Sequence, residues 1–351
     1  MLYNFIGDIH GRTNWKTLIK KDAVNIFLGD YFSPYNKSND LDNYIGYNQC
    51  KRNFLEIIKL KEENPNNTVL LLGNHDVDHW CLHERGISRF DAEHYQQIHD
   101  LFEKYKDYFT IAYNVNDDLL ITHAGVSAQW YFNQKYPNDH MLHVIWMDSK
   151  LDNKDICIWD AYCEYIEKTV TDDFTLPYPS ETYSKEDLEY FDRCRKDMQE
   201  RKRKLLDKPN KSDIYVFNGH FYYYSIEDGD FIEQIVNIPT IVNDINNDFW
   251  INRKAEFRFD RNAPSWDYCG ESEMHGPLWI RPESLGYSNI LGCYPGKYQI
   301  VGHTQFHTIY MNDEHHILHD IAFCDCLEYD TASLLYDSET KEFTIQKIEN
   351  I

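Results

Sequence analysis

The stretch LYNFIGDIHGRTNW, residues 2–15, places an acid and a histidine directly after a short apolar run. Residues 2–6 have the length and apolar character of a buried strand, which ends at Gly7. Asp8 and His10 follow, separated by one residue. A carboxylate and an imidazole at this spacing either form an ordinary polar strand end or hold a metal ion. The rest of the sequence decides between these two interpretations.

Four further apolar runs end in the same kind of residues. These strand ends read Gly29-Asp30, Gly73-Asn74-His75-Asp76, His123-Ala124-Gly125 and Gly302-His303-Thr304. Helical patterns at 41–62 and about 91–107 separate the strands of the first third of the chain. This alternation of strand and helix predicts an α/β layered fold.

In α/β sheets the loops beyond the carboxyl ends of the strands meet in one crevice. We therefore expect six side chains with ligand atoms to converge there: Asp8, His10, Asp30, Asn74, His123 and His303. Oxygen and imidazole ligands without thiolate suit manganese, iron, zinc or magnesium. Six ligands are too many for one catalytic ion with open positions, and they suit two ions about 3.5–4 Å apart that share a carboxylate.

Taken in order, GDIHG, GD, GNHD, HAG and GHT resemble the motifs of the calcineurin-like metallophosphoesterase superfamily. GDIHG and HAGVS are most similar to its phosphoprotein phosphatase branch, including the bacteriophage serine/threonine phosphatases. The resemblance covers about residues 1–127 and 298–348. It implies a four-layered α/β/β/α sandwich and a hydrolase with two divalent ions. Manganese is the favoured metal, and iron, zinc or magnesium are alternatives.

The resemblance also implies a role for each ligand. Asp8, His10 and Asp30 would hold the first ion, and Asp30 would bridge to a second ion. That second ion would be held also by Asn74, His123 and His303. A hydroxide held by the ions would attack phosphorus, and His75 would protonate the leaving group.

The last ligand has a rival. His220 follows a strand-like run in YVFNGHF, much as His303 follows YQIV. We prefer His303 because GHT fits the family better. Other branches of the family have GHxH, whose final histidine joins the first ion. Gln305 stands at that position here, which predicts an open or water-filled coordination position.

The sequence departs from the phosphoprotein phosphatase pattern at the second motif. That branch continues as GDxxDRG, in which the second Asp orients the catalytic histidine and the Arg clamps phosphate. Here GDYFSPY has Ser33 and Pro34 instead, and Leu72 precedes GNHD where the branch often has arginine. We expect Asp76 to act with His75 in catalysis. The candidates for contact with substrate, or for the missing cation, are Arg12, Tyr35, His220, Arg85 and Arg89.

The composition limits the partners of the protein. Its 351 residues include 35 Lys and Arg against 58 Asp and Glu, so the formal net charge is −23. A field of that sign repels duplex nucleic acid and anionic membranes. A phosphorylated substrate is compatible with it, because bound cations outweigh the distant field locally. Nine scattered cysteines, no C-x-x-C pair, no secretory signal and no apolar run of about 18 residues predict a cytoplasmic protein with free thiols.

These observations predict a metallophosphoesterase core at 1–130 and 296–351, with an insertion or cap subdomain at 131–295. The favoured function is hydrolysis of a phosphomonoester, as in a protein phosphatase, with a phosphoprotein or nucleotide as the substrate. One alternative is a phosphodiesterase or nucleotide pyrophosphohydrolase, because the arginine clamps are missing. The other alternative is a metal-binding regulatory module without turnover.

Overall fold

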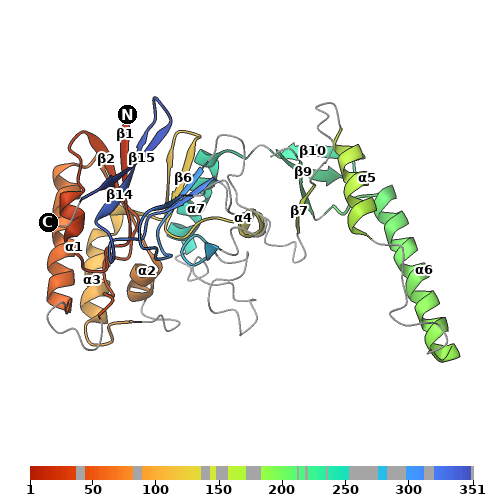
Figure 1. Cartoon of the computed structure of the whole chain (residues 1–351), viewed down its shortest axis with the longest axis horizontal. Coiled ribbons are helices and arrows are strands. Elements are labelled where there is room, and N and C mark those ends of the chain that lie inside the picture. Colours follow the sequence, from red (N-terminus) through yellow and green to blue (C-terminus); the bar gives the residue numbers. More distant parts are fainter. Residues whose placement is uncertain are drawn as a thin grey trace. The chain divides into compact units, whose positions relative to one another are not determined.

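The computed structural model describes the chain in separate stretches. They are residues 1–36, 44–81, 89–135, 143–147, 157–170, 183–211, 213–217, 220–234, 236–252, 276–282, 298–311 and 320–348. The chain forms two compact units (Figure 1). Unit 1 comprises Met1–Tyr131 and Asn237–Ile351, and unit 2 comprises Phe132–Val236.

Unit 1 contains two sheets. The six-stranded sheet has the order β15-β14-β1-β2-β3-β4. Its strands are β1 (Leu2–Ile6), β2 (Ala23–Phe27), β3 (Thr68–Leu71), β4 (Phe109–Thr110), β14 (Ala332–Asp337) and β15 (Glu342–Lys347). The five-stranded sheet has the order β12-β13-β11-β6-β5. Its strands are β5 (Ala112–Val115), β6 (Leu119–Thr122), β11 (Tyr298–Val301), β12 (Tyr310–Met311) and β13 (Ile321–Phe323).

Both sheets have a parallel centre. Strands β1 to β4 are parallel in the first sheet, and β6, β11 and β13 are parallel in the second. The carboxyl ends of neighbouring parallel strands lie on the same edge of a sheet. The loops after β1, β2, β3, β6, β11 and β13 are therefore the ones that can meet at a common site.

The two sheets pack face to face, and helices cover their outer faces. Phe5 and Ile26 of one sheet share a buried cluster with Ile121 and Ile300 of the other. The helices that begin or lie in unit 1 are η1 (Asn14–Thr17), α1 (Tyr47–Glu63), α2 (Asn74–Trp80), α3 (Tyr95–Tyr105), η2 (Lys106–Tyr108), α4 (Ala128–Lys135) and α7 (Ile238–Asn252). Helix α1 packs beside α3 and contacts β3, while α7 contacts β5 and β6 (Figure 1). The predicted α/β/β/α order of layers is confirmed.

Helix α7 belongs to unit 1, although the sequence-based insertion runs over 131–295. The Oδ1 atom of Asn246 accepts hydrogen bonds from the Oγ1 of Thr110 and from the backbone N–H groups of Ile111 and Ala112, at 2.6–3.1 Å. These bonds satisfy the backbone between β4 and β5, so they tie the helix to the core.

Unit 2 is a smaller α/β structure. Its sheet has the order β10-β9-β8-β7. Its elements are β7 (Val144–Trp146), α5 (Ile158–Thr169), α6 (Lys185–Asp207), β8 (Ile214–Phe217), β9 (His220–Ser225) and β10 (Asp230–Gln234). Tyr162, Tyr215 and Phe231 are central to its core. In the described part of the chain, no helix combines the length and apolar character that a membrane span requires.

Candidate metal centre

The loops after β1 and β2 are joined by backbone hydrogen bonds. The N–H of His10 donates to the carbonyl of Asp30 at 2.6 Å, and the N–H of Gly11 donates to the carbonyl of Tyr31 at 3.1 Å. His10 and Asp30 both have positive φ, 44° and 54°. These left-handed residues end the strands abruptly, which leaves the side chains of Asp8, His10 and Asp30 at the sheet edge.

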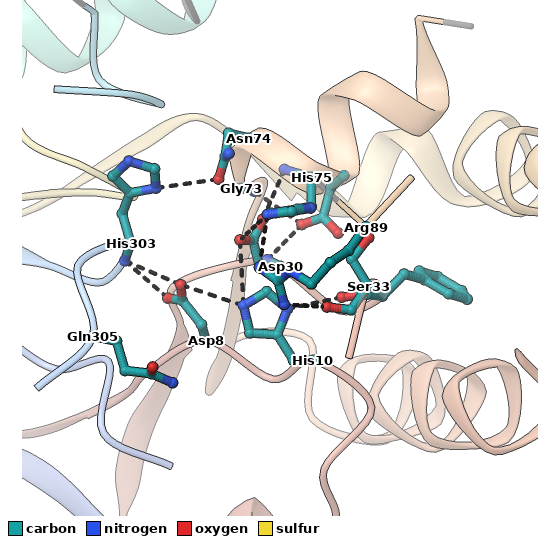
Figure 2. A network of polar contacts seen from close by, with 12 residues as sticks. Asp8, His10, Asp30, Ser33, Gly73, Asn74, His75, Arg89, His303 and Gln305 are labelled. Carbon is teal, nitrogen blue, oxygen red and sulfur yellow. Dashed lines mark hydrogen bonds and ion pairs between the residues drawn. The ribbon is translucent and has the colours of Figure 1, made fainter. Parts of the chain in front are cut away.

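Asp8, His10 and Asp30 form a buried group with ligand atoms within 4.8 Å of one another. The Nδ1 of His10 donates to the carbonyl of Phe32 at 2.9 Å, so Nε2 is the acceptor in the neutral ring. This Nε2 lies 3.6 Å from Asp30 Oδ2 and 3.9 Å from Asp8 Oδ2 (Figure 2). It has no hydrogen-bond partner among the described residues. A buried acceptor between two carboxylates fits a cation.

A second group of ligand atoms lies on the other side of Asp30. The Oδ1 of Asn74 is 3.0 Å from His123 Nε2 and 3.2 Å from His303 Nδ1, and Asp30 Oδ2 is 3.7 Å from His123 Nε2. His123 Nδ1 faces the carbonyl of Leu28 at 2.7 Å, and His303 Nε2 faces that of Trp279 at 3.2 Å. Carbonyls only accept, so the opposite nitrogen of each neutral ring carries the lone pair. All six predicted ligands are therefore brought together.

Burial sets the charge state of these groups. Desolvation lowers the pKa of His123 to about 3 and also lowers the pKa values of His10 and His303. These imidazoles are neutral at physiological pH, as ligands must be. Desolvation raises the pKa of Asp30 to about 7 and raises that of Asp8. Charged carboxylates are unfavourable in this site unless a cation compensates them.

His75 and Arg89 lie beside Asp30. The N–H of His75 donates to Asp30 Oδ1 at 2.9 Å. Arg89 Nη2 donates to His75 Nε2 at 3.1 Å, and its Nη1 donates to the carbonyl of Ser33 (Figure 2). The guanidinium also lies over the ring of Tyr35, 3.3 Å from the ring centroid. Arg89 thus brings a cation to the place that Ser33 and Pro34 leave without one, and Arg85 lies outside the described residues.

Asp76 organises the loop that carries Asp30. Its Oδ2 accepts the N–H groups of Asp30 and Gly73 at 2.7 and 2.9 Å, and its Oδ1 accepts that of Tyr31 at 2.9 Å. These contacts make Asp76 a positioning residue. The direct catalytic role expected from the sequence stays a prediction.

The candidate substrate contacts Tyr35, Arg12 and His220 have different surroundings. Tyr35 packs its ring edge-on to His10, with 4.8 Å between the centroids, so it lines the centre. Arg12 donates to Glu328 at 3.0 Å and lies 5.5 Å from the Tyr35 ring. His220 lies in unit 2, where its Nδ1 is 2.7 Å from Glu233 Oε1.

Three residues at the centre, Trp279, Arg281 and Asp325, are not predicted as site residues from the sequence. Trp279 contacts His303 as described above, and Arg281 Nη1 donates to the His303 carbonyl at 3.2 Å. The positive charge of Arg281 lowers the pKa values of His303 and His123. Asp325 follows β13 and is wholly buried. The signal that marks the first two is the compact run GPLWIR, which combines an aromatic ring with a cation; Asp325 ends a strand as Asp8 does.

The family assignment agrees with this geometry. The model of the calcineurin-like phosphoesterase family matches residues 1–224. The chain belongs to this family. Within it, Asp8, His10 and Asp30 form a possible divalent-metal site.

The solved structures that are similar to part of the chain include a protein serine/threonine phosphatase from Saccharomyces cerevisiae with similarity to human phosphatase PP5. The identity is 21%, the match covers 36% of this chain and 38% of that chain, and the TM-score is 0.26. The phosphoesterase therefore matches less than half of that chain. No curated protein matches the sequence.

Proposed function

We propose that this phosphoesterase holds two divalent ions and hydrolyses a phosphomonoester. The observation that carries the proposal is the place of Asp30 Oδ2, 3.6 Å from His10 Nε2 and 3.7 Å from His123 Nε2. One carboxylate between two sets of ligands suits a pair of metal ions that share it. Asp8 and His10 complete the first set, and the second consists of Asn74, His123 and His303. Manganese is the metal we favour, with iron, zinc and magnesium as alternatives.

Two such ions, when bound, lower the pKa of coordinated water and neutralise phosphoryl oxygens. The protein's own residues then supply orientation and a proton. Arg89 offers a guanidinium to phosphoryl oxygens, which are stronger acceptors than an imidazole nitrogen. We propose that a bound phosphoryl group takes over the Arg89 donor that His75 accepts. The Nε2 of His75 is then free to carry the proton that the leaving group receives.

A second candidate substrate is a phosphodiester or a nucleotide pyrophosphate. Ser33 and Pro34 occupy the positions where an acid and an arginine would favour a dianionic monoester. Within the described residues, Arg89 is the guanidinium that donates to His75. A site with fewer cations discriminates less against a monoanionic diester.

The experiment compares p-nitrophenyl phosphate with bis-p-nitrophenyl phosphate in the presence of Mn²⁺. We expect the monoester to be hydrolysed faster, and the reverse order would favour the second candidate. Asp30→Asn is expected to abolish turnover of both esters with an unchanged circular dichroism spectrum. Asp100→Asn, an exposed carboxylate on α3, is the matched control. Undiminished turnover by Asp30→Asn would reject the two-ion site.

The natural substrate that we propose is a phosphoprotein or a nucleotide. We also propose an insertion or cap subdomain within 131–295. Cys50, Cys324 and Cys326 are free thiols, which supports a reducing, cytoplasmic location.

A further inference from the structure

Asp325 is a buried carboxylate that the proposed reaction does not use. Its side chain is wholly buried, and neither of its carboxylate oxygens has a hydrogen-bond partner among the described residues. Buried carboxylates are otherwise paired, hydrogen-bonded or bound to a metal. The position of Asp325 therefore requires an explanation.

The backbone places Asp325 against the first half of the metal centre. A Cβ atom on Gly7 would lie 2.1 Å from the carbonyl oxygen of Cys324 and 3.0 Å from the Cα of Asp325, so the segment after β13 passes directly beside Gly7, the residue before Asp8. The N–H of Phe306 donates to the Asp325 carbonyl at 2.8 Å, which fixes the segment.

A polar network joins Glu328 to Arg12 and Gln305. Glu328 accepts hydrogen bonds from Arg12 Nη2 at 3.0 Å and from Gln305 Nε2 at 2.6 Å. Gln305 stands where other branches of the family have a histidine ligand, and its amide N–H binds Glu328. The coordination position predicted to be open is thus left to another residue.

We propose that Asp325 supplies a further oxygen ligand to the ion held by Asp8, His10 and Asp30. This inference rests on the proposed metal centre and adds to its ligand set. The first site then has three carboxylates and one imidazole. A set with three carboxylates is rich in oxygen, which suits Mn²⁺ or Mg²⁺.

The test is calorimetric titration of metal-stripped protein with MnCl₂ at pH 8, together with the metal content per chain. We expect two ions in the parent protein. Asp325→Ala should bind one of them at least tenfold more weakly, and Asp325→Asn should lose less because it keeps an amide oxygen. Asp330→Asn is the matched control, since Asp330 is also buried but accepts bonds from Lys347 and Thr308. It should bind both ions like the parent.

Thermal unfolding separates a ligand from a structural carboxylate. Metal-stripped Asp325→Asn should melt above the metal-stripped parent, because a buried charge without a partner is gone, and Mn²⁺ should raise its melting temperature less. Asp330→Asn should melt lower than the parent. Parent-like Mn²⁺ affinity in Asp325→Ala, or a lower melting temperature of metal-stripped Asp325→Asn, would overturn the inference. A parent that binds a single ion, weakened by Asp325→Ala, would reject the two-ion proposal and still support the ligand.

Discussion

Replacing Asp76 by Asn tests how the loop of Asp30 is held. The Asp76 carboxylate is buried and accepts three backbone N–H groups, those of Gly73, Asp30 and Tyr31. Asparagine keeps one acceptor oxygen and presents an NH₂ group in place of the other. Whichever way the amide is turned, at least one backbone N–H then faces a donor instead of an acceptor.

The magnitude follows from the number of bonds lost. If the amide oxygen takes the place of Oδ2, the bonds from Gly73 and Asp30 are kept and that from Tyr31 is lost. A hydrogen bond to a charged group contributes about 1.5–3 kcal/mol, and a buried unpaired donor costs about 1–3 kcal/mol. We expect the free energy of unfolding of metal-stripped protein to fall by about 2–4 kcal/mol. Because Asp30 shifts with its backbone, the Mn²⁺ affinity should fall by about 10–100-fold.

The assay is urea unfolding of the metal-stripped protein combined with calorimetric Mn²⁺ titration. Asp100→Asn serves as the control and should stay within about 0.5 kcal/mol of the parent. Unchanged stability together with unchanged Mn²⁺ affinity would refute the positioning role. Lost turnover at saturating Mn²⁺, with both other quantities unchanged, would instead support the direct catalytic role that the sequence predicts for Asp76.

Three further predictions concern phosphate binding, space and pH. Arg89→Met should raise the inhibition constant of inorganic phosphate by about 10–100-fold, the equivalent of one charge-assisted hydrogen bond. Arg89→Lys should restore part of the inhibition. Equal inhibition constants for Arg89→Met and the parent would contradict this prediction. Gly73→Ala should abolish Mn²⁺ binding, because the added Cβ would lie 2.1 Å from Asp30 Oδ1. Gly46→Ala is the control: its Cβ would meet only the Tyr44 ring, at 3.4 Å, and this variant should bind Mn²⁺ normally in the same titration. Burial raises the pKa values of Asp30 and Asp325 to about 7, so the folded metal-stripped protein holds protons that the unfolded chain releases near pH 4. The buried histidines have lowered pKa values and act oppositely, but this effect declines above about pH 6.5, the usual pKa of a histidine in the unfolded chain. The melting temperature of metal-stripped protein should therefore fall between pH 6.5 and 8, and a rise in that interval would contradict the assignment.

The sequence predicts the strand ends well because each of them is marked locally. A short apolar run fixes a buried strand, and the polar residue after it has to face the sheet edge. This argument places Asp8, Asp30 and His123 from the sequence alone. The same reasoning gave the α/β class, and the resemblance gave the order of the layers.

Residues that reach the site from outside such strand ends are not singled out by the sequence. Arg89 is one of three arginines that the sequence offers as the missing cation, and its contact with His75 depends on tertiary structure. The contacts of α7 with the core are not marked in the sequence either. Its contacts with the backbone between β4 and β5 come from Asn246, which no periodic pattern distinguishes from a surface asparagine.

Most of the short motifs contain a glycine before the ligand, and these glycines explain why local motifs predict a site that distant segments form together. At Gly73 and Gly302 an added Cβ would lie 2.1 Å from Asp30 Oδ1 and from Asp8 Oδ1, respectively. Gly73 has a φ of −98°, which any residue adopts, so glycine is needed there for space and not for backbone conformation. At each of these glycines a carboxylate from another loop occupies the space that a side chain would need. At Gly7 an added Cβ would lie 2.1 Å from the carbonyl oxygen of Cys324 and 3.0 Å from the Cα of Asp325, so this glycine leaves space for the backbone segment that carries Asp325. The motif that first indicated a metal site thus also indicates, through its glycine, the neighbour that we propose as its additional ligand.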